Sequence, residues 1–300
     1  MSAERLLREL RAELDDAGLH GSFLVRDLDS GQELGIEPDL EFSIASLVKV
    51  PLAIATLERI RRGELDGATR ILVRPDAITA PGPFGLSRFR HPTRIAVDDL
   101  LYLSTCVSDN AAADTLFGLT PPAEVARLVA GLGLRGITVR RTLRDLSRTV
   151  AELLGPADAH LAHSLAIGAG TAGRGHPVPQ LDVSRANSGS ARACVELLQA
   201  LWTPSSIPSE VAGRMRELLG DNVLRQRLAP DFSSDSSTWS SKTGTLINLR
   251  HEIGVVEHAD GQRFAVAALT ESRVPAIHQP EAEALMGRVA RRLRDHLRGG

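Results

Sequence analysis

Residues 42–52 read FSIASLVKVPL, a stretch that places one serine and one lysine within an apolar run. The apolar spacing predicts a helix from about Ser46 to Arg62, with Ser46 in its first turn and Lys49 over the same face. A serine hydroxyl is a weak nucleophile unless a base removes its proton, and a desolvated lysine with a lowered pKa can be that base. The alternative is an N-cap serine with a solvated lysine, which the apolar neighbours disfavour.

Lysine is rare in this chain, since Lys49 and Lys242 are the only lysines among 35 lysine and arginine residues. A buried lysine can lose its proton and an arginine cannot, so both positions fit sites that need a compact amine. Lys242-Thr243-Gly244 ends a predicted strand. Lining a cleft, Lys242 and Thr243 would grip a carboxylate, and Gly244 would let a ligand approach closely. The alternative explanation for the two lysines is a general bias toward arginine. The alternative for Lys242-Thr243-Gly244 is a strand end that leads into a turn.

Ser108-Asp109-Asn110 is a third polar group, at the junction of two helical patterns. Ser108 would relay a proton toward a leaving group, and Asn110 would hydrogen-bond a substrate amide with both its donor and its acceptor. Asp109 is expected to brace the loop. The alternative is an ordinary N-cap for the second helix.

Composition excludes several classes of function. The formal net charge of −2 gives no electrostatic basis for a nucleic-acid partner, and 3% aromatic residues leave few platforms for stacking. Cys106 and Cys194 form no disulfide or metal framework, and no element carries histidines or carboxylates at ligand spacing. We therefore expect no metal and no other cofactor.

The N-terminal 19 residues form an amphipathic helical pattern interrupted by charges, which is not typical of a signal peptide. No window approaches ~18 uninterrupted apolar residues, so neither a membrane span nor a membrane partner is expected. A cytoplasmic protein is the simplest prediction, and an exported protein with its signal removed is the alternative.

The order of the expected elements indicates an α+β fold. Strands are predicted at 22–27 and 33–36, and again at 238–243, 249–258 and 262–270. Because these strands come from the two ends of the chain, they can share one antiparallel sheet only by meeting across the helical middle. Helical patterns lie at 97–107, 110–117, 122–130, 147–154, 158–167, 191–202 and 210–219, with a closing helix around 285–293 and a Pro- and Gly-rich loop at 75–94.

This pattern predicts one catalytic unit of two lobes. An antiparallel sheet flanked by helices would occupy about residues 1–60 and 205–300. An all-helical lobe would occupy about 61–204, with an insertion near 151–180.

The three motifs together, in this order, are the signature of serine β-lactamases and penicillin-binding proteins. The chain resembles the class A β-lactamase and penicillin-binding protein superfamily over about residues 20–273. The resemblance implies a β-lactamase/DD-peptidase-like fold and an acyl-serine mechanism. In that mechanism Ser46 is acylated, Lys49 is its base or base partner, and Ser108 shuttles protons.

The resemblance also implies how substrate would bind. Asn110 would hold a substrate amide, and Lys242, Thr243 and Gly244 would bind a carboxylate. The backbone N–H groups of Ser46 and Thr245 would form the oxyanion hole. Arg250, on the next predicted strand, matches a carboxylate-assisting arginine of many members, although a solvated strand arginine is an equal alternative.

The chain departs from the family in the segment that serves deacylation. β-Lactamases carry Glu-x-x-Leu-Asn between the second and third motifs, and no such segment is found here. Asp145 falls closest by position, although its side chain is one methylene shorter and no Leu-Asn pair follows. His160, His163 and His176 in the insertion are further candidates for a base. We therefore expect acylation of Ser46, and leave its fast release open.

Three functions follow. The first is a serine hydrolase that opens a β-lactam or a related amide or ester, with a carboxylate-bearing small molecule as its substrate. The second is a slow-releasing acyl acceptor or sensor. The third is a peptidoglycan carboxypeptidase or transpeptidase, which the lack of an export signal disfavours.

Overall fold

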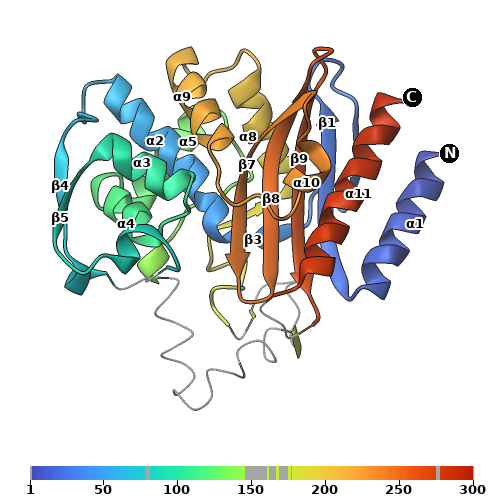
Figure 1. Ribbon diagram of the computed structural model, residues 1–300, viewed down its shortest axis with the longest axis horizontal. Coiled ribbons are helices and arrows are strands. Elements are labelled where there is room, and N and C mark those ends of the chain that lie inside the picture. Colours follow the sequence, from blue (N-terminus) through green and yellow to red (C-terminus); the bar gives the residue numbers. More distant parts are fainter. Residues whose placement is uncertain are drawn as a thin grey trace.

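The computed structural model describes residues 2–78, 82–145, 161, 167–168, 175–176, 178–274 and 278–299. Its centre is a five-stranded antiparallel sheet in the order β2-β1-β9-β8-β7 (Figure 1). The strands are β1 Leu19–Asp27, β2 Glu33–Ile36, β7 Ser237–Leu246, β8 Leu249–His258 and β9 Arg263–Ser272. The predicted α+β fold is confirmed.

The two ends of the chain meet in the middle of the sheet, as predicted. β1 pairs antiparallel with β9, from Leu19 opposite Ser272 to Asp27 opposite Phe264. β7 pairs with β8 and forms one edge of the sheet. The Lys242 motif therefore lies on an edge strand.

Both faces of the sheet are covered, so its central strands are apolar on both sides. Phe23 and Val25 of β1 belong to a core with α1 and α11, whereas Leu24 belongs to a second, larger core. α1 (Ala3–Asp16) and α11 (Pro280–Arg298) cover the first face with α10 (Ala229–Phe232), and the other helices lie on the far side (Figure 1).

The helices of the larger core surround α2, which spans Lys49–Arg61 and is buried from Lys49 to Glu58. A helix that is buried on all sides needs no polar face, which explains the nearly continuous apolar sequence. The helices around it are α3 Val97–Thr105, α4 Asn110–Leu119, α5 Pro122–Gly131, α8 Ala191–Trp202 and α9 Ser209–Gly220.

Ser46 does not lie in an α-helix, which corrects the predicted start of the long helix. It lies in a 3₁₀ turn, η1 (Ala45–Val48), and α2 begins at Lys49. Pro51 has no N–H to donate to the carbonyl of Leu47, so the first turn cannot close as a full α-helical turn.

Two pairs of short strands were not predicted from the sequence. β3 (Glu41–Ser43) pairs with β6 (Ser188–Ser190), and β4 (Arg70–Val73) pairs with β5 (Thr93–Ala96). The 75–94 loop contains the 3₁₀ turns η2 (Pro75–Ala77) and η3 (Gly85–Arg88), and its last two residues begin β5. The helical patterns at 147–154 and 158–167 and most of the 151–180 insertion lie outside the described residues.

Candidate active site

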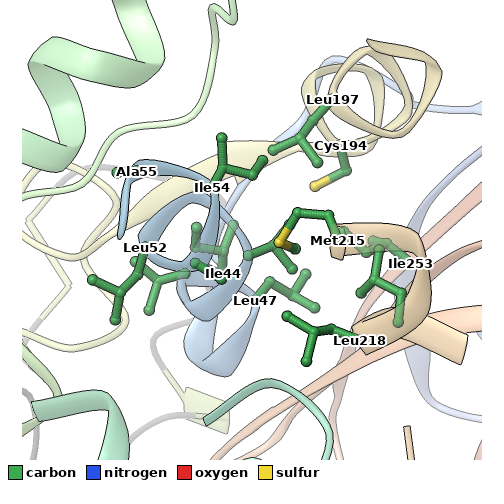
Figure 2. Close-up of a cluster of buried hydrophobic side chains, with 14 of the residues drawn as sticks. Ile44, Leu47, Leu52, Ile54, Ala55, Cys194, Leu197, Met215, Leu218 and Ile253 are labelled. Carbon is green, nitrogen blue, oxygen red and sulfur yellow. The ribbon is translucent and has the colours of Figure 1, made fainter. Parts of the chain in front are cut away.

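Ser46 is held by a turn whose flanking side chains are buried. Ala45 has φ 48°, a left-handed conformation that costs a residue with a side chain about 1–2 kcal/mol. Ile44 and Leu47 anchor the turn in the larger core, against Leu218 of α9 and Ile253 of β8 (Figure 2). We call residues 43–48 the Ser46 turn.

Hydrogen bonds fix the same turn from two sides. The N–H of Ile44 donates to the Asn187 carbonyl at 2.9 Å. The buried imidazole of His251 contacts the Ser43 carbonyl through Nε2 at 2.9 Å, while Nδ1 accepts the N–H of Thr270 at 3.2 Å. Burial lowers the pKa of His251 to about 4, so the ring is neutral at pH 7 with its proton on Nε2.

Lys49 joins the first two sequence motifs. Its Nζ lies 3.3 Å from Ser46 Oγ, 2.8 Å from Asn110 Oδ1 and 2.7 Å from the Ser108 carbonyl. It also lies 3.2 Å from Ser108 Oγ. The Lys49 side chain is fully buried, so the alternative of a solvated lysine is wrong.

The contacts of Lys49 favour a neutral amine that faces Ser46. Burial lowers the Lys49 pKa to about 7, against the opposing charges of Asp109 and Asp114. A neutral amine has two hydrogens and one lone pair. Because the Ser108 carbonyl and Asn110 Oδ1 only accept, they take the two hydrogens and leave the lone pair for the hydroxyl groups.

Ser108 lies between the two lysines of the chain. Its Oγ is 2.9 Å from Lys242 Nζ and 3.2 Å from Lys49 Nζ, and its backbone is left-handed, with φ 62°. The pKa of Lys242 falls well below its ordinary value because of burial, and then because of the nearby charges of Lys49 and Arg227. A hydroxyl between two amines can pass a proton from one to the other.

Asp109 braces the loop, as predicted, and it also caps α4. Its carboxylate accepts the N–H groups of Leu86 at 2.6 Å and Ala111 at 2.9 Å. Gly85 has φ +65°, and a Cβ there would lie 2.2 Å from Asp109 Oδ2. Glycine therefore lets the 82–88 segment pack against the Ser108 motif.

The third motif borders the Ser46 turn. Thr243, Gly244 and Thr245 follow Lys242 along β7, and a Cβ on Gly244 would lie 3.1 Å from the Ile44 carbonyl. The sequence motifs thus converge as expected: direct hydrogen bonds link Ser46, Lys49, Ser108, Asn110 and Lys242.

Two arginines lie behind this strand. Arg250 is the cross-strand partner of Thr245 and is 4% exposed, so the alternative of a solvated arginine is wrong. Burial and neighbouring Arg227 lower the Arg250 pKa, and its NH1 donates to the Ile247 and Leu249 carbonyls. Sequence reasoning missed Arg227 and also His251, because no motif or periodicity marks either residue.

Asp145 hydrogen-bonds to a residue of its own segment rather than to the Ser46 and Lys49 cluster. Its exposed carboxylate accepts the N–H and hydroxyl of Thr142, at 3.1 and 2.9 Å. His176 is buried and its Nδ1 accepts the N–H of Val178 at 2.9 Å, while His160 and His163 lie outside the described residues.

The described part of the chain shows neither a metal-binding cluster nor a membrane-spanning helix. No group of three or more histidine, cysteine, aspartate or glutamate side chains there could hold a metal ion. None of the helices described is both long enough and apolar enough to span a bilayer.

The sequence matches a protein-family model and a curated protein. The model of the β-lactamase enzyme family matches residues 5–297. The chain is 65% identical over 309 residues to the β-lactamase regulatory protein BlaB of Streptomyces cacaoi, covering 99% of each protein.

Solved structures share the fold at low identity. A mutant of PBP-A, solved as an acyl-enzyme complex with penicillin-G, matches with a TM-score of 0.77 at 19% identity, over 99% of this chain and 97% of that one. A β-lactamase from Sphaerobacter thermophilus matches with a TM-score of 0.75 at 22% identity, over 97% of each chain. At these identities the likeness establishes the fold alone.

Proposed function

Because the chain belongs to the β-lactamase enzyme family, we propose that it opens a β-lactam, or a related amide or ester, by acylation of Ser46. The observation that carries the proposal is the buried Lys49 amine, which contacts both Ser46 Oγ and Ser108 Oγ. A serine beside an amine whose pKa is about 7 has a base at neutral pH.

The proposed chemistry has three proton transfers. Lys49 takes the Ser46 proton as Oγ bonds to the carbonyl carbon, which develops an oxyanion. The oxyanion collapses, the C–N bond breaks, and the leaving nitrogen takes a proton from Ser108. Ser108 is then reprotonated through the amines that it touches, Lys49 and Lys242. The product is an ester of Ser46 with the ring-opened substrate.

Substrate would bind along the free edge of β7. Asn110 commits Oδ1 to Lys49, which leaves its Nδ2 group to donate to a substrate carbonyl. Lys242, Thr243 and Gly244, with Arg250 behind them, favour a small molecule that carries a carboxylate. The N–H groups of Ser46 and Thr245 would hold the oxyanion.

A second candidate is an acceptor that keeps its acyl group. Two observations favour it. The carboxylate of Asp145, the residue nearest in position to the deacylating glutamate of β-lactamases, is hydrogen-bonded to Thr142. The 65% identical relative is named a regulatory protein. In this role the acyl-enzyme would be the signal rather than an intermediate.

A chromogenic cephalosporin in excess over protein separates the two candidates. Acylation that is faster than release predicts a burst of one equivalent of opened ring per protein molecule. A rapid steady state after the burst supports the hydrolase, and a negligible one supports the acceptor. No burst and no turnover would remove both, and release of terminal D-Ala from a cell-wall pentapeptide would instead favour a DD-peptidase.

A further inference from the structure

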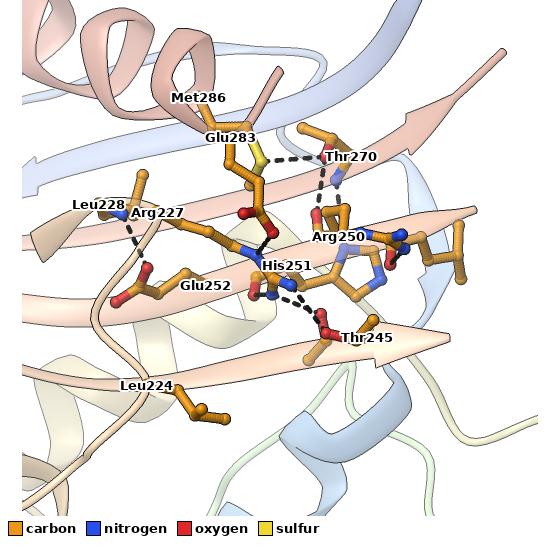
Figure 3. A network of polar contacts seen from close by, with 12 residues as sticks. Leu224, Arg227, Leu228, Thr245, Arg250, His251, Glu252, Thr270, Glu283 and Met286 are labelled. Atoms are coloured by element: carbon orange, nitrogen blue, oxygen red, sulfur yellow. Dashed lines mark hydrogen bonds and ion pairs between the residues drawn. The ribbon is translucent and has the colours of Figure 1, made fainter. Parts of the chain in front are cut away.

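Arg227 is a buried cation that contacts the peptide proposed to bind the oxyanion. It lies between α9 and α10 and is 2% exposed. NH1 donates to the Gly244 carbonyl at 2.8 Å and to the His251 carbonyl at 2.7 Å, and NH2 donates to Thr245 Oγ1 at 2.7 Å (Figure 3). Nε donates to Glu283 of α11 at 2.8 Å.

These contacts use four of the five N–H donors of the guanidinium. The Glu283 carboxylate also balances its charge. Arg227 therefore uses its donors for hydrogen bonds within the protein, and three of the four go to the hairpin of β7 and β8.

The peptide that Arg227 contacts also carries a proposed oxyanion donor. The Gly244 carbonyl and the Thr245 N–H belong to one peptide group, and no described peptide bond is cis, so the two point in opposite directions. Gly244 and His251 are cross-strand partners, and NH1 bridges their carbonyls. The Gly244 carbonyl thus faces β8, and the Thr245 N–H faces the free edge of β7.

The Ser46 turn lies against β7 beside this peptide, on the face that Lys242 and Gly244 share. A Cβ on Gly244 would be 3.1 Å from the Ile44 carbonyl of the Ser46 turn. Lys242, two residues earlier on β7, reaches Ser108 from the same strand.

We infer that Arg227 is a positioning residue for the oxyanion: it orients and polarises the Gly244–Thr245 peptide so that the Thr245 N–H donates to the carbonyl attacked by Ser46. The inference rests on the proposed acylation. A charge-assisted hydrogen bond to a carbonyl makes the N–H of the same peptide a stronger donor. Loss of a whole oxyanion donor costs about 10²–10³ in rate, so loss of its support should cost about 10-fold.

The alternative role for Arg227 is direct binding of a substrate carboxylate. Arg227 borders the same cavity as Thr245, Arg250 and His278, so position alone does not separate the two roles. The two roles differ in which substrates acylate the protein more slowly once the arginine is replaced.

The test uses Arg227→Met and Arg227→Lys, with Arg225→Met as the matched control. Lysine keeps the charge but cannot form the four-way contact. Arg225 comes from the same segment, and its NH1 donates to the carbonyl of Trp239, near the start of β7 and away from Thr245. Each protein is acylated with a β-lactam that has a free carboxylate and with its methyl ester, and the ¹⁵N shift of the Thr245 amide is recorded without ligand.

Both Arg227 variants should lose about 10-fold in acylation rate with acid and ester alike, and the Thr245 amide should shift more than any other amide of β7. Arg225→Met should change neither. A loss confined to the free acid, or an unmoved Thr245 amide, would overturn the inference. If Arg227→Met does not fold, Arg227→Lys decides alone. If the parent is never acylated, the proposed function fails, while the amide shift still decides whether Arg227 orients this peptide.

Discussion

Raising the pH from 5 to 8 should speed acylation of Ser46 by about 100-fold, because the base must lose its proton first. The Lys49 pKa of about 7 lies below the ordinary 10.5, so the neutral amine accumulates as pH rises through 7. About half of the protein carries a neutral Lys49 at pH 7, about a tenth at pH 6 and about a hundredth at pH 5. An unperturbed lysine would be neutral in only about 0.03% of molecules at pH 7.

The assay is a single turnover with protein in excess over a chromogenic cephalosporin, followed in a stopped-flow instrument from pH 5 to 9. The rate should follow a single ionisation with its midpoint near 7. Lys49→Met, which keeps a similar side-chain volume, should show no such rise of the rate with pH and should be acylated at least ~100-fold more slowly. A parent profile that is flat between pH 6 and 8, or a Lys49→Met variant as fast as the parent, would refute Lys49 as the base.

Further variants test the surroundings of the site. Asn110→Asp puts a carboxylate beside the catalytic amine and should raise the midpoint of the acylation profile by about 1–2 pH units; an unmoved midpoint would contradict the contact between residue 110 and Lys49 Nζ. Gly85→Ala should lower the free energy of unfolding in urea by about 2–4 kcal/mol through its clash, while Gly63→Ala, with nothing within 4 Å, should cost only about 1 kcal/mol; equal losses would rule out the clash. Because the folded protein holds the His251 pKa near 4, below 6.5, stability should fall by up to about 3 kcal/mol as pH drops from 6.5 to 4, and His251→Gln should flatten that slope; parallel slopes would contradict this. Asp145→Asn should leave the lifetime of the acyl-enzyme unchanged, and a longer lifetime by mass spectrometry would restore Asp145 as the deacylation base.

The sequence predicted the features that depend on local patterns. Alternating or periodic apolar residues marked the five strands of the central sheet and the longer described helices, although not the four-residue α10. The motif spacing led to Ser46, Lys49 and Lys242. The lowered pKa of Lys49 also followed from its apolar neighbours, because burial is its main physical cause.

Features that arise from distant segments were not predictable in this way. Arg227 matters only because a loop, the β7–β8 hairpin and α11 converge on it, and nothing local separates it from the other arginines. The left-handed Ala45 and the short pairs β3–β6 and β4–β5 are likewise imposed by tertiary packing, which overrides the local preference of each segment.

The most direct test of the central claim is the intact mass of the protein after incubation with penicillin G, followed by peptide mapping. Acylation predicts a gain of one whole penicillin on the peptide that contains Ser46, and no gain in Ser46→Ala. An unmodified parent at saturating penicillin, or an adduct that persists in Ser46→Ala, would contradict it.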